Sequence, residues 1–102
     1  MLLEEFNFKR EVLDDAGPVL VDFWAEWCPP CRMMNPVVTA LSRDFKVCKV
    51  NTETNPGLAA KFGVSAIPLL LIFRAGEVAR RFEGVTDDAT LRAALTALSG
   101  GP

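Results

Sequence analysis

The sequence predicts an α/β fold with one central, mixed, five-stranded sheet that helices cover on both faces. Apolar, β-prone segments alternate with segments of helical spacing, which favours strands that run parallel in one sheet. The last two strand segments are joined only by Arg74-Ala75-Gly76-Glu77, which predicts an antiparallel hairpin. The segment Val19–Trp24 is apolar almost throughout, as expected of a strand buried on both faces.

Length and composition limit the classes of protein. At 102 residues, half of them apolar, the chain is expected to form a single domain over residues 1–102 with an ordinary core. The net charge is −2 and the longest basic run is Arg80-Arg81, which argues against nucleic-acid binding. No apolar run approaches the roughly 18 residues of a membrane span. The acidic N-terminus argues against a signal peptide, so we expect a cytoplasmic monomer.

In the first half of the chain, Leu2-Leu3 is predicted to form a short edge strand. Asn7 is expected to cap a helix that Gly17-Pro18 ends. The strand over residues 19–24 follows, and residues 45–50 are expected to form the next buried strand.

In the second half, an Asn-Pro start and a Gly end predict a short helix over residues 55–63. Residues 69–73 and 78–82 are the two strands of the hairpin. Thr86-Asp87-Asp88 is expected to open a final amphipathic helix, and Gly100-Gly101-Pro102 to end it.

Two cysteines stand where the strand over residues 19–24 passes into a helix. Pro29 and Pro30 suit the first turn of that helix, where backbone N–H groups lack intrahelical partners. Cys28 is therefore expected at or just before the helix N-terminus, where partial positive charge favours a thiolate. Pro36 is expected to kink the helix. Its apolar stripe consists of Met34, Val37, Val38 and Leu41.

The Cys28-x-x-Cys31 spacing suits dithiol chemistry. One sulfur can attack an external disulfide while the other waits behind it, and we expect Cys28 to be nearer the surface and to attack first. The alternative is half of a zinc site. Structural zinc usually needs four Cys or His ligands, and the chain has no histidine and only Cys48 besides, so the pattern favours redox chemistry.

Asp22 interrupts an otherwise apolar strand. Burial disfavours an ionised carboxylate, so we expect a raised pKa for this side chain. Two interpretations stay open at this point. The carboxyl could serve the nearby thiols as a proton-transfer group, or it could be a structural carboxylate satisfied by Lys49 or by water.

The segment Trp27-Cys28-Pro29-Pro30-Cys31, preceded by Val-Asp-Phe-Trp-Ala-Glu, resembles the active-site segment of the thioredoxin family. The resemblance extends over almost the whole chain and implies the thioredoxin fold. The other matching positions, in the family's order, are Lys49, Asn55-Pro56-Gly57, Ile67-Pro68, Gly76-Glu77 and Gly84.

The resemblance also implies roles for individual residues. It gives Asp22 a proton-transfer role toward Cys31, with Lys49 as a nearby charge. It implies a cis peptide bond before Pro68, next to the sulfurs, which would leave the backbone of Ile67 free to pair with a substrate strand. The substrate-contacting residues implied in this way are Trp27, Pro29, Pro30, Ile67, Pro68 and Gly84.

The predicted function is the reduction of protein disulfides, with Cys28 as nucleophile and Cys31 as resolving thiol. The resemblance implies no bound cofactor, clients that contain disulfides, and thioredoxin reductase, an NADPH-dependent flavoprotein, as the electron source. Three alternatives remain: an oxidant or isomerase of the same fold, a non-catalytic binding module, and a small metal protein.

Three positions depart from the family's pattern. Pro29 stands where the family usually has glycine, and Leu69 replaces a polar residue that commonly follows the cis-proline. Glu83 places a charge where the family's contact surface is usually apolar. These differences bear on partner choice and reduction potential more than on the chemistry itself.

Overall fold

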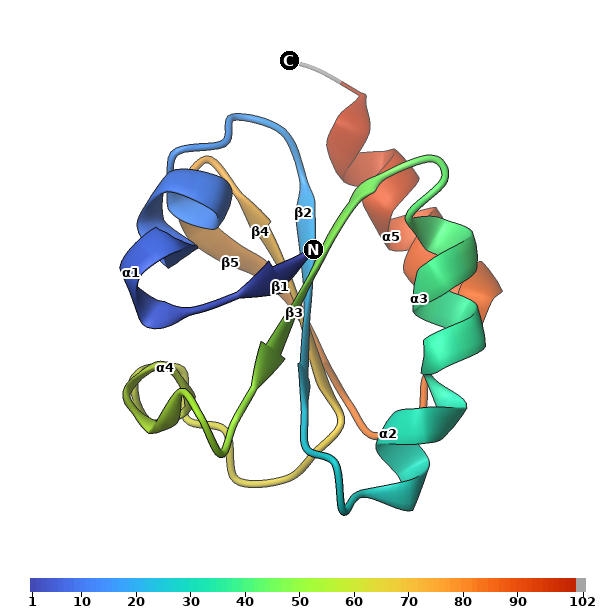
Figure 1. Ribbon diagram of the computed structural model, residues 1–102. Helices are drawn as coiled ribbons and strands as arrows, with labels where there is room; N and C mark the ends of the chain where they lie inside the picture. The colour runs from blue at the N-terminus through green and yellow to red at the C-terminus, as the bar shows by residue number, and fades with distance from the viewer. Residues whose placement is uncertain (101–102) are drawn as a thin grey trace.

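A computed structural model describes residues 1–100 and shows one mixed sheet with the strand order β1-β3-β2-β4-β5 (Figure 1). Strands β1 and β2 both run parallel to β3, whereas β4 runs antiparallel to β2 and to β5. The predicted mixed, five-stranded sheet is therefore confirmed. The strands are β1 (Leu2–Leu3), β2 (Val19–Trp24), β3 (Lys46–Asn51), β4 (Leu69–Arg74) and β5 (Glu77–Glu83).

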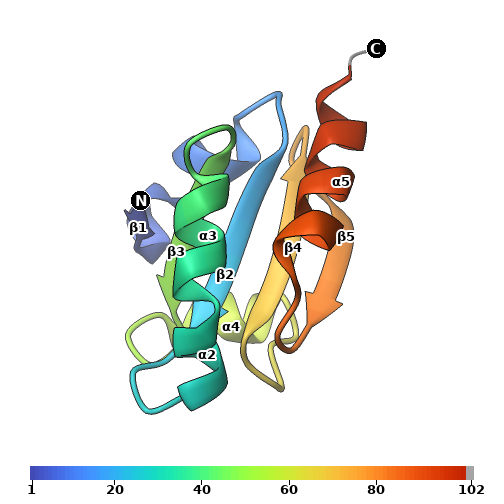
Figure 2. The same cartoon turned by 90° about the vertical axis from the view of Figure 1, so that its right-hand side faces the viewer.

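Helices cover both faces of the sheet, as the sequence predicts. One face carries α1 (Glu5–Phe8), the π-helical turn η1 (Lys9–Leu13) and α4 (Pro56–Lys61) (Figure 1). On the other face lie α2 (Pro29–Met33), α3 (Asn35–Leu41) and α5 (Asp88–Ser99), which Figure 2 shows in front of the strands. Gly100 follows α5, while Gly101 and Pro102, which were expected to help end it, lie outside the described residues.

The side chains of β2 point alternately to the two faces of the sheet and contribute to two separate hydrophobic cores. Val19, Val21 and Phe23 point to the face of α1 and α4, where they join a cluster rich in phenylalanine. Leu20 points to the other face and packs with residues of α3 and α5. Asp22 lies two residues after Leu20 on the strand, so its carboxyl points to the same face of the sheet. This is the face covered by the helices that follow the cysteines.

The first helix differs from the prediction. Asn7 is not its cap: the helix begins at Glu5, and the Oδ1 of Asn7 accepts a hydrogen bond from the Glu4 N–H at 2.9 Å. Asn7 thus occupies the third helical position and satisfies a backbone donor from inside the first turn. Regular helical structure ends at Leu13, four residues before Gly17.

The helix after the cysteines is broken in two, in agreement with the kink predicted at Pro36. Helix α2 ends at Met33 and α3 begins at Asn35, which leaves Met34 as the junction. Pro36 is the second residue of α3, where it has no backbone N–H to donate to the preceding turn. The break makes Asn35 the first residue of a new helix.

Helices α1 and α4 cap each other's N-termini. The Oδ1 of Asn55, which precedes α4, accepts a hydrogen bond from the Glu5 N–H of α1 at 3.1 Å. In return, the carboxylate of Glu5 accepts a hydrogen bond from the Leu58 N–H of α4 at 3.2 Å. The amide of Asn55 also donates to the Asn51 carbonyl oxygen at 3.1 Å, at the end of β3. This side chain therefore joins two helices and a strand.

We expect Asn55→Ala to lower the free energy of unfolding by about 1–3 kcal/mol. Asn55 is only 1% exposed, so the substitution leaves buried donors and acceptors without their partner. Denaturant unfolding followed by circular dichroism measures the change. The matched control is Glu53→Gln in the exposed turn next to it, which should stay within about 0.5 kcal/mol of the wild type. Equal effects of the two substitutions would contradict this role of Asn55.

Candidate active site

The cysteine pair lies at the start of α2, immediately beyond the end of β2. Cys28 is the N-cap of this helix, and its Sγ accepts a hydrogen bond from the Cys31 N–H at 3.2 Å. Pro29 and Pro30 fill the first two helical positions and have no N–H, so Cys31 supplies the first donor of the helix. The two cysteines form a disulfide, with their Cα atoms 5.3 Å apart. The predicted placement of Cys28 at the helix N-terminus is confirmed.

Exposure does not distinguish the two cysteines. Cys28 is 2% exposed and Cys31 is 3% exposed, so the expectation that Cys28 lies nearer the surface is wrong for the disulfide form. Both pack with Ala25 in a small cluster bordered by Trp24 and Ile67. What separates the two sulfurs is their place in the helix: one is the cap and the other belongs to the first turn.

The loop before β4 comes next to the disulfide. The Ile67-Pro68 peptide bond is cis, as the resemblance implies, and the Cys28 Sγ lies 3.8 Å from the Ile67 carbonyl oxygen. The Gly84 N–H donates a hydrogen bond to the Pro68 carbonyl oxygen at 2.8 Å, which ties the end of β5 to this loop. Gly84 has a φ of +82°, a conformation that favours glycine.

Beside this loop the surface is partly apolar. Trp27 is 64% exposed and Pro29 and Pro30 are also exposed, so three of the residues expected to contact a substrate are accessible. A shallow hollow of about 180 Å³ adjoins them, lined by Trp27, Thr52, Val64, Ser65, Ala66 and Ile67.

Asp22 is fully buried on β2. Neither carboxylate oxygen has a hydrogen-bond partner within residues 1–100. Burial raises the pKa of Asp22 to about 6, and the positive charge of Lys49 opposes part of this increase. The carboxyl can therefore gain or lose a proton close to neutral pH, which is the property expected of a proton-transfer group.

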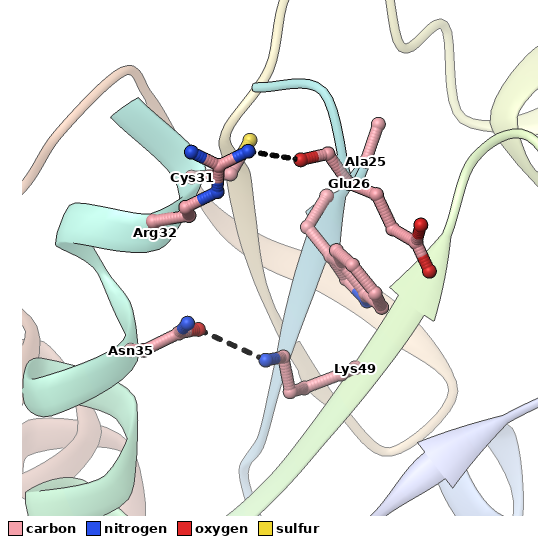
Figure 3. Close-up of a pocket in the computed structure, with 7 residues that line it drawn as sticks. Ala25, Glu26, Cys31, Arg32, Asn35 and Lys49 are labelled. Carbon is pink, nitrogen blue, oxygen red and sulfur yellow. Dashed lines mark hydrogen bonds between the residues drawn. The ribbon is translucent and has the colours of Figure 1, made fainter. Parts of the chain in front are cut away.

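Lys49 does not hydrogen-bond to this carboxyl. Its Nζ donates to the Oδ1 of Asn35 at 3.0 Å and lies 5.0 Å from the centre of the Trp24 ring (Figure 3). The structural interpretation therefore does not gain a direct hydrogen bond from Lys49 to Asp22.

A pocket of about 370 Å³ is lined by Cys31 at one end and Lys49 at the other (Figure 3). Within it, the Arg32 guanidinium donates a hydrogen bond to the Glu26 carbonyl oxygen at 2.9 Å, so Arg32 is an exposed side chain bonded to backbone. The pocket is lined by Trp24, Ala25, Glu26, Cys31, Arg32, Asn35 and Lys49.

Asn35, which hydrogen-bonds to Lys49, is one of the pocket residues that our sequence analysis missed. The signal was available, because Asn35 follows Cys31 by four residues, which places both on one face of a helix. The break at Met34 and the contact with Lys49 could not be inferred from that spacing.

The third cysteine is remote from the pair. Cys48 belongs to the core on the α1 and α4 face, and burial raises the pKa of its thiol, as expected of an inert cysteine. Residues 1–100 contain no group of three or more His, Cys, Asp or Glu side chains placed to hold a metal ion. Nor does this part of the chain contain a helix long and apolar enough to cross a membrane.

A disulfide at the N-terminus of a helix, on a mixed sheet and beside a cis-proline, defines a thiol–disulfide oxidoreductase site. The thioredoxin family model matches residues 1–97. The chain is 46% identical to a thioredoxin of Porphyra purpurea and 47% identical to thioredoxin 1 of Nostoc sp., each over 87% of both chains. It is 43% identical to a thioredoxin of Synechocystis sp. over 91% of both chains. The chain therefore belongs to the thioredoxin family and has the thioredoxin fold.

Burial of Asp22 has a consequence for stability. Its folded pKa of about 6 lies above the unfolded value of about 3.9, so the folded state binds more protons in this window and stability falls as pH rises through it. Asp22→Asn removes the titration. We expect the unfolding free energy of this variant, relative to wild type, to rise by about 2 kcal/mol between pH 4 and pH 7.

Denaturant unfolding of the oxidised proteins at pH 4, 5, 6 and 7 measures this difference. The matched control is Asp14→Asn at an exposed carboxylate, for which the difference should change by less than about 1 kcal/mol. A difference for Asp22→Asn that does not vary with pH would show that the buried carboxyl does not titrate in this range.

Proposed function

We propose that the protein acts as a reductant of protein disulfides, with Cys28 as the nucleophile. The observation that supports this assignment is the hydrogen bond from the Cys31 N–H to the Cys28 Sγ. In the reduced protein, the same N–H and the N-terminus of α2 would stabilise negative charge on that sulfur. A thiolate is the form of cysteine that attacks disulfides.

The reaction is two successive exchanges. The Cys28 thiolate attacks one sulfur of the client disulfide, a mixed disulfide forms, and the other client sulfur leaves as a thiolate. Cys31 then loses its proton and attacks the Cys28 Sγ. This step forms the Cys28–Cys31 bond and releases the second client sulfur. The client gains two electrons, and its two thiolates take up the protons that the two cysteines gave up.

Asp22 is proposed to accept the Cys31 proton in the second exchange. Its carboxyl is buried on β2, the strand that leads to the cysteines, has no hydrogen-bond partner in the described residues, and has a pKa of about 6. A carboxylate with that pKa is a better base than an ordinary aspartate and is still largely ionised at neutral pH. Lys49, whose charge lowers the Asp22 pKa, is proposed to tune this exchange.

Clients are proposed to bind across the disulfide and the loop before β4. The Ile67 backbone would pair with an extended client segment, while Pro68 and Gly84 hold that loop in position. Trp27, Pro29 and Pro30 would supply exposed apolar contacts around the sulfurs. Glu83 is exposed at the end of β5 near this surface, where its carboxylate pairs with the Arg81 guanidinium at 3.2 Å.

The cysteine pair carries the two electrons itself, so no bound cofactor is required. An NADPH-dependent flavoprotein thioredoxin reductase would return the pair to the dithiol form. Reducing conditions of this kind prevail in the cytoplasm, which is the proposed location, with the chain working there as a monomer.

Trapping tests the assignment of the nucleophile. In Cys31→Ser the second exchange is blocked, so we expect mixed disulfides with clients to accumulate on non-reducing gels. In Cys28→Ser the attacking sulfur is missing and such adducts should be scarce. Cys48→Ser, which alters a buried sulfur outside the pair, is the control and should behave like the wild type. The reverse pattern for the first two variants would make Cys31 the nucleophile.

Insulin reduction by dithiothreitol tests whether the protein catalyses disulfide exchange. We expect the wild type to accelerate it. A protein with intact thiols that does not accelerate it would be a non-catalytic binding module, whereas a redox titration in glutathione buffers separates a reductant from an oxidant or isomerase.

A further inference from the structure

Asp22 and Lys49 are direct neighbours in the sheet. They are register partners in the parallel pair β2 and β3. Leu20 and Val47, two residues earlier on each strand, pack in the same core, so both side chains point to the face of α2 and α3. A lysine side chain is long enough to reach a carboxyl on the adjacent strand, yet both oxygens of Asp22 lack a partner in the described residues. Something else holds the ammonium group.

The competing acceptor comes from Asn35. The Lys49 Nζ donates to the Oδ1 of this residue at 3.0 Å (Figure 3), and it lies 5.0 Å from the centre of the Trp24 ring. Asn35 reaches this point because the chain breaks at Met34 and restarts as α3. The Asn35–Lys49 pair also forms part of the wall shared by two hollows, one beside Cys31 and one beside Met1.

We propose that Asn35 is a positioning residue that holds the Lys49 ammonium away from the Asp22 carboxyl, leaving that carboxyl without an ion pair and available for proton exchange with Cys31. The proposal rests on the proposed function for the identity of the proton donor. It assigns a role in the site to Asn35, which lies outside the strand that carries the Asp22 carboxyl.

The positive charge of Lys49 explains why its position affects Asp22 as a base. A direct ion pair with Lys49 would favour the ionised form of Asp22 and make it a weaker base, because an adjacent positive charge lowers the pKa of a carboxyl. At its present position the ammonium lowers this pKa only partly, and burial dominates. Asn35 is neutral, so it holds the ammonium without adding a charge of its own.

The other polar and charged groups around the pocket are not placed to change the Asp22 pKa in a comparable way. The Arg32 guanidinium on α2 is bonded to the Glu26 backbone, and both of these side chains are exposed. Cys31 is in the disulfide in the oxidised protein and has no thiol proton. On the other side of Asp22, its register partner on β4 is the apolar Leu70. Lys49 is the charge that acts on the Asp22 pKa.

The test is a titration of the Asp22 side-chain carboxyl carbon by NMR in the oxidised protein. We expect Asn35→Ala to lower the pKa of Asp22 by about half a unit or more, because the released ammonium moves to the carboxylate. Lys49→Met should raise this pKa. In the Lys49→Met background, Asn35→Ala should have no further effect, because no ammonium remains to be held.

Thr39→Ala on the exposed face of α3 is the matched control and should leave the Asp22 titration unchanged. An unchanged or raised pKa in Asn35→Ala would overturn the proposal. An equal shift of the Asp22 pKa by Asn35→Ala in the wild type and in the Lys49→Met background would also overturn it, since Asn35 would then act through packing or hydration. This titration does not depend on turnover, so a failure of the proposed function would appear separately, as absence of insulin reduction.

Discussion

The hydrogen bond from the Cys31 N–H to the Cys28 Sγ is the interaction on which the site depends. It exists because a buried strand ends at Trp24 and a helix starts at Pro29, which leaves Cys28 as the cap. Two prolines in the first turn remove the competing donors, so the sulfur takes the first N–H of the helix. The neighbouring Ile67-Pro68 loop then borders this sulfur. The rest of the sheet holds these two segments side by side.

At Asp22, the stability of the fold and the proposed proton transfer make opposite demands. A hydrophobic residue at position 22 would suit β2 better, because an unpaired buried carboxyl is destabilising once it ionises. Pairing it with Lys49 would reduce that cost but would also weaken it as a base. The structure has neither arrangement: the ammonium is bonded to Asn35 and stacked on Trp24. The proposed roles of Asp22 and Asn35 account for this choice.

Much of the fold and part of the site were predictable from local sequence. Apolar runs placed β2 and β4 to within a residue, because burial on both faces leaves little freedom in composition. Asn7 was misassigned because asparagine serves both as a cap and as the third helical residue of a capping box. The equal burial of Cys28 and Cys31 and the contact between Asn35 and Lys49 depend on tertiary packing. Spacing along one segment does not contain that information.

The central claim is that the helix N-terminus activates Cys28, and the rate of alkylation tests it most directly. The reduced protein is treated with iodoacetamide at neutral pH, and the modified sites are mapped by mass spectrometry over time. If the cap position favours the thiolate, Cys28 is alkylated before Cys31 and Cys48, and faster than in the urea-unfolded chain. Alkylation of Cys31 first, or of Cys28 no faster than in the unfolded chain, would contradict the claim.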